Sequence, residues 1–244
     1  MESHSSSTVY RGIFADRQEA GRRLAGALMR YRDEKPVVVA LFRGGVPAGY
    51  EIARALGAPL DVLFVRKLRA PGVSVPDPSH ASPGAVADGA TPQRFVDPAV
   101  VERLHIDQDY LDSETRIQLK IIEEQQRRYR GQRLPLELTG HTVIVVDDGI
   151  ATGNTVRAGL QAIRAGEARH CVLAVPVAPL RTLLTLVGEV EDSVCLLMPN
   201  DFQSVDFYYA DFAPIPDENL FEMLYKGCSP AGQAATGRGL RWEG

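Results

Sequence analysis

The sequence contains no apolar run that approaches the roughly 20 residues needed for a bilayer-spanning helix. Residues 1–8 are rich in serine and lack the basic start and apolar core of a secretory signal. We therefore expect a soluble, cytoplasmic protein without a membrane partner. Residues 227–244 are rich in glycine, alanine and serine, so this tail is predicted to be flexible and residues 1–8 to be disordered.

The chain has only three cysteines and five histidines, and neither set forms a recognisable site. Cys171 and Cys195 lie in apolar, strand-like runs and Cys228 lies in a polar tail, which indicates buried thiols rather than a disulfide framework. The histidines lack metal-ligand spacing and a Gly-x-Ser-x-Gly motif is absent, so zinc and serine-hydrolase chemistry are disfavoured. The histidines are His4, His80, His105, His141 and His170.

A basic excess is also missing, because the formal net charge is −4. Together with the lack of a helix-turn-helix or a basic arm at the N-terminus, this argues against a nucleic-acid partner and favours a small molecule. The length of 244 residues and the hydrophobic content of 45% are typical of a globular chain with one main domain.

Five short apolar runs predict strands that are covered on both faces. Between them, apolar residues recur three or four positions apart and predict helices. This alternation indicates the α/β class, with a doubly wound, mainly parallel, five-stranded sheet. Such sheets bind ligands at the carboxyl ends of their strands, which directs attention to the segments that follow the runs. The runs are residues 37–42, 60–65, 142–146, 171–175 and 194–197.

Two stretches interrupt the alternation. Residues 70–98 contain six prolines, so we expect a long, flexible surface loop without a regular helix or strand, placed as a cover over an active site. Residues 109–130 are charged and favour a helix with an apolar side, which should end at Gly131.

The segment 143–155 joins a predicted strand to a predicted helix through a turn of small residues. Gly149 and Gly153 let backbone amides point into one concavity, and Thr152 and Thr155 add hydroxyl donors. A helix that opens near Asn154 presents free N–H groups and the positive end of its dipole. The turn, including Ile150 and Ala151, is therefore predicted to bind a phosphate.

Asp147 and Asp148 lie where the predicted strand ends, directly before the phosphate turn. Carboxylates at an anion site need another partner, and the two hydroxyls of a ribose match them, with a magnesium ion nearby. Two other interpretations are a solvated turn and the magnesium cluster of a phospho-acceptor domain with flavodoxin-like winding.

Four apolar residues, two acids and a loop that ends in Thr-Gly-x-Thr resemble the signature of the type I phosphoribosyltransferase family. The resemblance covers about residues 9–226 and is greatest to a branch with a long insertion after the second strand. It implies a fold with a small hood, the donor 5-phosphoribosyl 1-pyrophosphate, Mg²⁺ as cofactor and a role in nucleotide metabolism. A homodimer is a further expectation from the family.

A second strand-to-helix turn contains Arg43, Gly44 and Gly45, at the position of the family's pyrophosphate loop. Its Gly-Gly-x-x-x-Gly spacing differs from a dinucleotide fingerprint. Arg66 and Lys67 follow the second predicted strand and add positive charge for a diphosphate. The resemblance thus implies catalytic roles for the residues Asp147, Asp148, Arg43 and Lys67.

The acceptor is expected to lie under a hood formed by residues 198–216, where Phe202 and Phe207 could stack on a planar ring. Core packing explains these aromatics equally well. Ala151 stands where family enzymes for 6-oxopurines carry an acid, which disfavours hypoxanthine and guanine. Two functions follow: transfer of phosphoribose to a nitrogen acceptor, or sensing of the donor or a nucleotide without catalysis.

Overall fold

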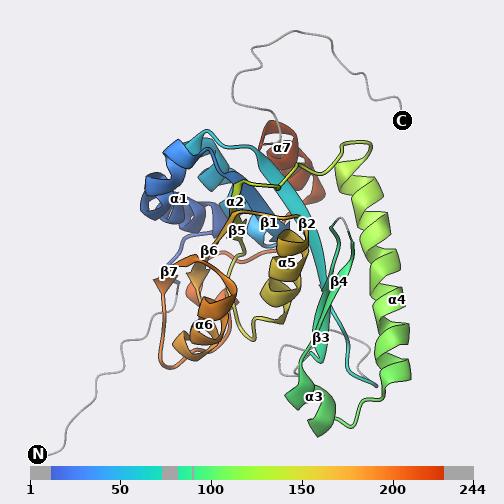
Figure 1. Cartoon of the computed structure of the whole chain (residues 1–244). Coiled ribbons are helices and arrows are strands. Elements are labelled where there is room, and N and C mark those ends of the chain that lie inside the picture. Colours follow the sequence, from blue (N-terminus) through green and yellow to red (C-terminus); the bar gives the residue numbers. More distant parts are fainter. Residues whose placement is uncertain (1–11, 73–81, 90, 228–244) are drawn as a thin grey trace, which may run out of the picture.

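The central element of the computed structural model, which describes residues 12–72, 82–89 and 91–227, is a seven-stranded sheet. Its strand order is β4-β3-β2-β1-β5-β6-β7, and the five strands from β2 to β7 in this order are parallel (Figure 1). These five are the strands predicted from the apolar runs. The bounds are β1 (Val37–Phe42), β2 (Leu60–Lys67), β3 (Gly84–Ala87), β4 (Gln93–Val96), β5 (Thr142–Val146), β6 (His170–Val177) and β7 (Asp192–Leu197).

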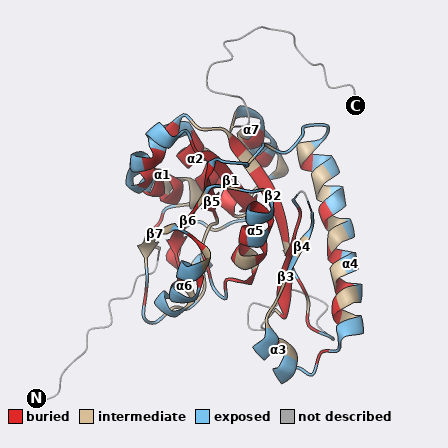
Figure 2. Ribbon diagram, viewed as in Figure 1, coloured by how far each residue is buried: buried red, intermediate tan, exposed pale blue. Residues whose placement is uncertain are grey.

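Helices cover both faces of the sheet, as a doubly wound architecture requires (Figures 1 and 2). Buried side chains of α1, α2, α4 and α7 pack on one face, and those of α5 and α6 pack on the other. The helices are α1 (Arg17–Leu28), α2 (Gly45–Leu56), α3 (Pro98–Arg103), α4 (Gln108–Gln125), α5 (Asn154–Ala165), α6 (Leu180–Leu186) and α7 (Asp217–Gly227).

The expectation of five strands, with no regular strand in residues 70–98, was wrong. β3 and β4 lie in this segment and extend the sheet beyond β2 as an antiparallel hairpin. Pro83 and Pro92 each directly precede a strand, so neither removes a hydrogen bond from the ladder. The small residues of β3 are all buried, and α5 packs against the hairpin. The high proline content of the segment concealed these two short strands.

The helix predicted over residues 109–130 is confirmed. α4 begins at an Asp107 cap, runs to Gln125 and continues as one wider turn to Arg130. Gly131, with a positive φ of 61°, ends it. The inward side of α4 is partly polar, because Glu114 and Gln118 are buried there while Ile117 is exposed.

Several sequence predictions concern residues outside the described ranges. They include the disorder of residues 1–8, most of the tail 227–244, and the part of the expected cover at residues 73–81. In the described part, Cys171 and Cys195 are both free thiols, and burial raises the pKa of each to about 11. None of the described helices combines the length and the apolar character that crossing a membrane would require.

The close contact between α1 and α2 gives a test of the packing. A Cβ at Gly21 would lie 2.6 Å from the Ala48 Cα, whereas a Cβ at Gly26 would meet nothing within 4 Å. We predict that Gly21→Ala lowers the free energy of unfolding by about 1–3 kcal/mol, because the helices must separate.

The matched control, Gly26→Ala in the same helix, should raise the free energy of unfolding by roughly 0.4–1 kcal/mol, because alanine restricts the unfolded chain. Urea denaturation of both variants measures the difference. Equal effects of the two substitutions would contradict this description of the α1–α2 contact.

Candidate functional site

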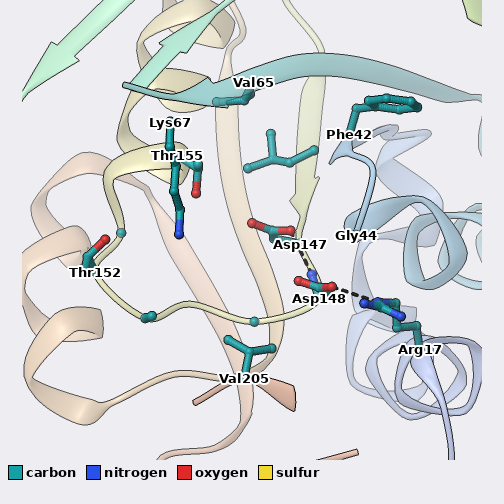
Figure 3. Close-up of a pocket in the computed structure, with 14 residues that line it drawn as sticks. Arg17, Phe42, Gly44, Val65, Lys67, Asp147, Asp148, Thr152, Thr155 and Val205 are labelled. Carbon is teal, nitrogen blue, oxygen red and sulfur yellow. Dashed lines mark hydrogen bonds and ion pairs between the residues drawn. The ribbon is translucent and has the colours of Figure 1, made fainter. Parts of the chain in front are cut away.

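A cavity of about 320 Å³ lies where β1, β2 and β5 end (Figure 3). Its place agrees with the rule that open α/β sheets bind ligands at the carboxyl ends of their strands. The residues that line it are Arg17, Leu41, Phe42, Gly44, Val65, Lys67, Asp147, Asp148, Gly149, Ala151, Thr152, Gly153, Thr155 and Val205.

The turn between β5 and α5 forms one wall of the cavity. Gly153 has a left-handed φ of 83° and precedes the first residue of α5, whose opening amides have no partner within the helix. Thr152 and Thr155 line the cavity on either side of Gly153. The wall therefore presents hydroxyls and free amides together, an arrangement that binds anions.

Ile150 of this turn and Asn154, the first residue of α5, support the turn from behind instead of lining the cavity. Ile150 is 2% exposed and packs in the core with Val156 and Val175. Asn154 is also 2% exposed, and its Nδ2 donates to the Ser82 carbonyl oxygen at 2.9 Å. These two side chains hold the turn against the rest of the fold.

Asp147 and Asp148 form the floor of the cavity, at the end of the fully buried strand β5. The Asp147 Oδ1 accepts a hydrogen bond from the Asp148 amide at 2.9 Å. Burial, with the neighbouring Asp148 carboxylate, raises the pKa of Asp147 well above its ordinary value of 3.8. Burial also raises the pKa of Asp148. The pair thus favours a ligand that supplies hydrogen-bond donors or positive charge.

The partner of Asp148 is Arg17, a residue that the sequence analysis missed. The Arg17 Nε donates to the Asp148 Oδ2 at 2.8 Å, and its charge opposes the rise in the pKa of Asp148 (Figure 3). Arg17 comes from the first turn of α1 and is separated from Asp148 by 131 positions. No local motif marks it, because only the packing of α1 beside the end of β5 brings the two side chains together.

The predicted cations are divided between the cavity and the surrounding fold. Lys67 lines the cavity, but Arg66, its neighbour on β2, points to the opposite face and donates to Gln118 at 2.5 Å. Arg43 does not line the cavity either. Its Nη2 donates to Asp217 at 2.8 Å and its Nη1 donates to the Tyr129 hydroxyl at 3.0 Å.

The two glycines after Arg43 permit close approach of the backbone, and only Gly44 lines the cavity. A Cβ at Gly44 would collide with the Asp148 carboxylate, and one at Gly45 would collide with the Val146 carbonyl oxygen. The turn that contains them therefore lies directly against the end of β5.

Phe202 and Phe207, the residues expected to stack on an acceptor, do not line the cavity. Both contact Tyr208: the ring centroids lie 5.7 Å apart for Phe202 and 5.3 Å apart for Phe207. This segment instead supplies Val205, which covers Gly149.

Comparison with known proteins identifies the family. The model of the phosphoribosyl transferase domain matches residues 14–211. Proteins of two Mycobacterium tuberculosis strains, CDC 1551 and H37Rv, each named "Putative phosphoribosyl transferase", are 38% identical over 212 residues. The chain belongs to the phosphoribosyl transferase family. The match covers 87% of this chain but only 46% of either relative, so the chain spans about half the length of these proteins.

A solved structure agrees with this membership. The crystal structure of TT1426 from Thermus thermophilus superposes with a TM-score of 0.69 and 36% identity, over 88% of this chain and 99% of that one. The predicted fold class, the type I phosphoribosyltransferase fold with a mostly parallel sheet, is confirmed, with seven strands rather than five. The region matched by the family model includes every residue that lines the cavity.

The raised pKa of Asp147 predicts a pH-dependent stability. The folded protein retains this proton to a higher pH than the unfolded chain does, so the free energy of unfolding should fall as pH rises above about 4. Asp147→Asn removes the titration while its side-chain oxygen can still accept the Asp148 amide hydrogen bond. We predict that the variant unfolds at higher urea concentration than wild type at pH 8 and that the difference disappears near pH 4. A difference independent of pH would contradict this description.

Proposed function

We propose that the protein transfers a 5-phosphoribosyl group from 5-phosphoribosyl 1-pyrophosphate to a nitrogen acceptor and releases pyrophosphate. One observation carries the proposal: a single cavity combines the adjacent carboxylates Asp147 and Asp148 with the anion-binding turn at the start of α5. A pentose phosphate has the complementary groups, two vicinal hydroxyls and a phosphate a few bonds away.

In this proposal, the backbone and hydroxyl groups of residues 149–155 bind the 5'-phosphate, and the two carboxylates accept hydrogen bonds from the ribose hydroxyls. Phosphate at a helix N-terminus gains from the free amides and the helix dipole. The hydroxyl donors satisfy carboxylates that solvent reaches poorly, since only 15% of the Asp148 side chain is exposed. The two interactions fix the sugar relative to the sheet.

The diphosphate of the donor is assigned to the Gly44 backbone and to Lys67, which both line the cavity. The Lys67 charge acts on both carboxylates, so its ammonium group lies near the assigned ribose site. Arg43 and Arg66 remain proposed diphosphate ligands only if they leave their partners Asp217 and Gln118.

The residues also fit a magnesium ion that binds together with the donor. No group of three or more His, Cys, Asp or Glu side chains within the described ranges would hold a metal alone. Mg²⁺ commonly uses one or two carboxylates and completes its shell with substrate phosphates and water, which matches Asp147 and Asp148. When bound there, the ion would neutralise charge on the departing diphosphate.

The transfer itself exchanges one bond for another at ribose C1. The nitrogen lone pair forms the N–C1 bond, the C1–O bond breaks, and pyrophosphate leaves with that electron pair. An acceptor nitrogen that carries a proton loses it to water or to the pyrophosphate, whereas a pyridine-type nitrogen becomes a cation in the product. The role of the protein is to bind both phosphates and the hydroxyls so that C1 faces the acceptor.

Asp148→Asn tests the donor site. Loss of the charge should weaken donor binding by about 10- to 100-fold in calorimetry with Mg²⁺, because a hydrogen bond to a charged group contributes about 1.5–3 kcal/mol. The matched control, Asp109→Asn on the exposed side of α4, should bind the donor as wild type does. Unchanged affinity of Asp148→Asn would exclude the proposed ribose site.

Turnover separates the enzyme from a sensor of the donor. An enzyme should release pyrophosphate when it is incubated with donor, Mg²⁺ and a panel of nitrogen acceptors. Donor binding without pyrophosphate release from any acceptor would support a sensor instead.

A further inference from the structure

The end of the cavity around Asp148 is where an acceptor would meet the donor. The 5'-carbon and C1 lie on opposite sides of a ribose ring, so a sugar with its phosphate on the α5 turn directs C1 away from that turn. Arg17, Gly44 and Val205 form the wall at that end (Figure 3). Lys67, the side chain assigned to the diphosphate, and Arg17 lie on opposite sides of the two carboxylates (Figure 3), so an acceptor opposite a diphosphate at Lys67 lies toward Arg17 and Val205.

Within the ranges that the structure describes, this wall offers no aromatic ring to a planar acceptor. Phe42 is the single aromatic residue among those that line the cavity, and its ring packs on Phe64 and Tyr129 in the core, with centroids 4.8 Å and 4.7 Å away. The aromatics of the segment after β7 contact one another, with Tyr209 packed between Phe14 and Phe212. Val205, which is aliphatic, faces the cavity in their place.

Arg17 is the polar group of this wall, and it is held rigidly. Its guanidinium lies over the Phe212 ring, 3.5 Å from the centroid, and its Nη1 donates to the Ala213 carbonyl oxygen at 3.1 Å. With its Nε bonded to Asp148, the Nη2 has no hydrogen-bond partner among the residues that the structure describes. The side chain is only 12% exposed, so these donors are largely desolvated and already oriented.

An arginine in this place selects by charge. Its guanidinium only donates hydrogen bonds, so it can bind the carbonyl oxygens of a neutral nucleobase as well as a carboxylate, and charge is what distinguishes the two. A neutral carbonyl and a carboxylate both make a charge-assisted hydrogen bond to the Nη2, but a carboxylate adds an ion pair, of which the Asp148 carboxylate on Nε offsets a part.

We infer that Arg17 is a specificity-determining residue that selects an acceptor with a carboxylate close to its nucleophilic nitrogen. This inference rests on the proposed transferase function and adds the chemical class of the acceptor. The acceptor is held by an ion pair and by contact with Val205, not by ring stacking on the hood.

Matched pairs of acceptors test the inference, each pair sharing one ring with and without the carboxylate. Orotate with uracil and nicotinate with nicotinamide serve as probes, with donor and Mg²⁺ present and pyrophosphate release measured. Wild type should show a kcat/KM at least about tenfold higher for the carboxylate member of at least one pair. The preference is a ratio within one protein, so damage to the donor site cancels.

Three variants test whether the preference for the carboxylate acceptor depends on Arg17. Arg17→Met should abolish it, and Arg17→Lys, which keeps the charge without the planar fork, should retain a reduced preference expressed in KM rather than kcat. Arg23→Met is the matched control, because Arg23 lies on the same helix but pairs with Glu19 away from the cavity. It should keep the full preference.

The outcomes distinguish this inference from the proposed function. Equal or better use of the neutral members by wild type, or an undiminished preference in Arg17→Met, overturns the role of Arg17 while the transferase function stands. Donor binding in calorimetry without turnover of any probe also counts against the acceptor class. Absence of donor binding overturns the proposed function and the inference with it.

Discussion

Two neighbouring carboxylates at the end of a buried strand impose the main electrostatic constraint on this protein. Asp147 and Asp148 follow β5, whose residues are all buried, and burial raises the pKa of both. Such groups persist in a fold only when other elements supply compensating charge or hydrogen bonds. Here the compensation comes from Arg17 on α1 and Lys67 on β2, whose charges oppose the rise in both pKa values.

Helices α4 and α7, which contribute none of the residues that line the cavity, bind two arginines that the sequence placed at it. α4 contributes the buried Gln118, which binds Arg66, and α7 begins with Asp217, which binds Arg43. Arg43 directly follows β1 and Arg66 lies near the end of β2. Both are next to residues that line the cavity, yet both side chains bond to residues outside it. The cavity is therefore lined by two cationic side chains, Lys67 and Arg17, and by two acidic ones, Asp147 and Asp148. This arrangement suits a ligand that has both phosphates and hydroxyls.

Local sequence was sufficient for the parts of the site that are continuous in the chain. The strand, the two acids and the turn at residues 142–155 are one segment, and the strand bounds and the start of α5 agree with its pattern. The β3–β4 hairpin was not predictable in the same way, because its strands are four residues each and are held by pairing of β3 with β2 and of β4 with β3. Arg17 was missed for a related reason: an arginine in the first turn of an amphipathic helix is usually exposed, and only tertiary packing turns it toward Asp148. The face to which Arg66 points depended on the register of β2, which the sequence pattern left open.

The hydrogen bond from Asn154 to the Ser82 carbonyl oxygen joins the turn before α5 to the residue that leads into β3. The Ser82 hydroxyl adds a hydrogen bond to the Leu68 carbonyl oxygen, so both ends of the segment between β2 and β3 are fastened at one point. A single residue thus connects the end of β2, the start of β3 and the anion-binding turn, so a change at Ser82 would act on all three at once.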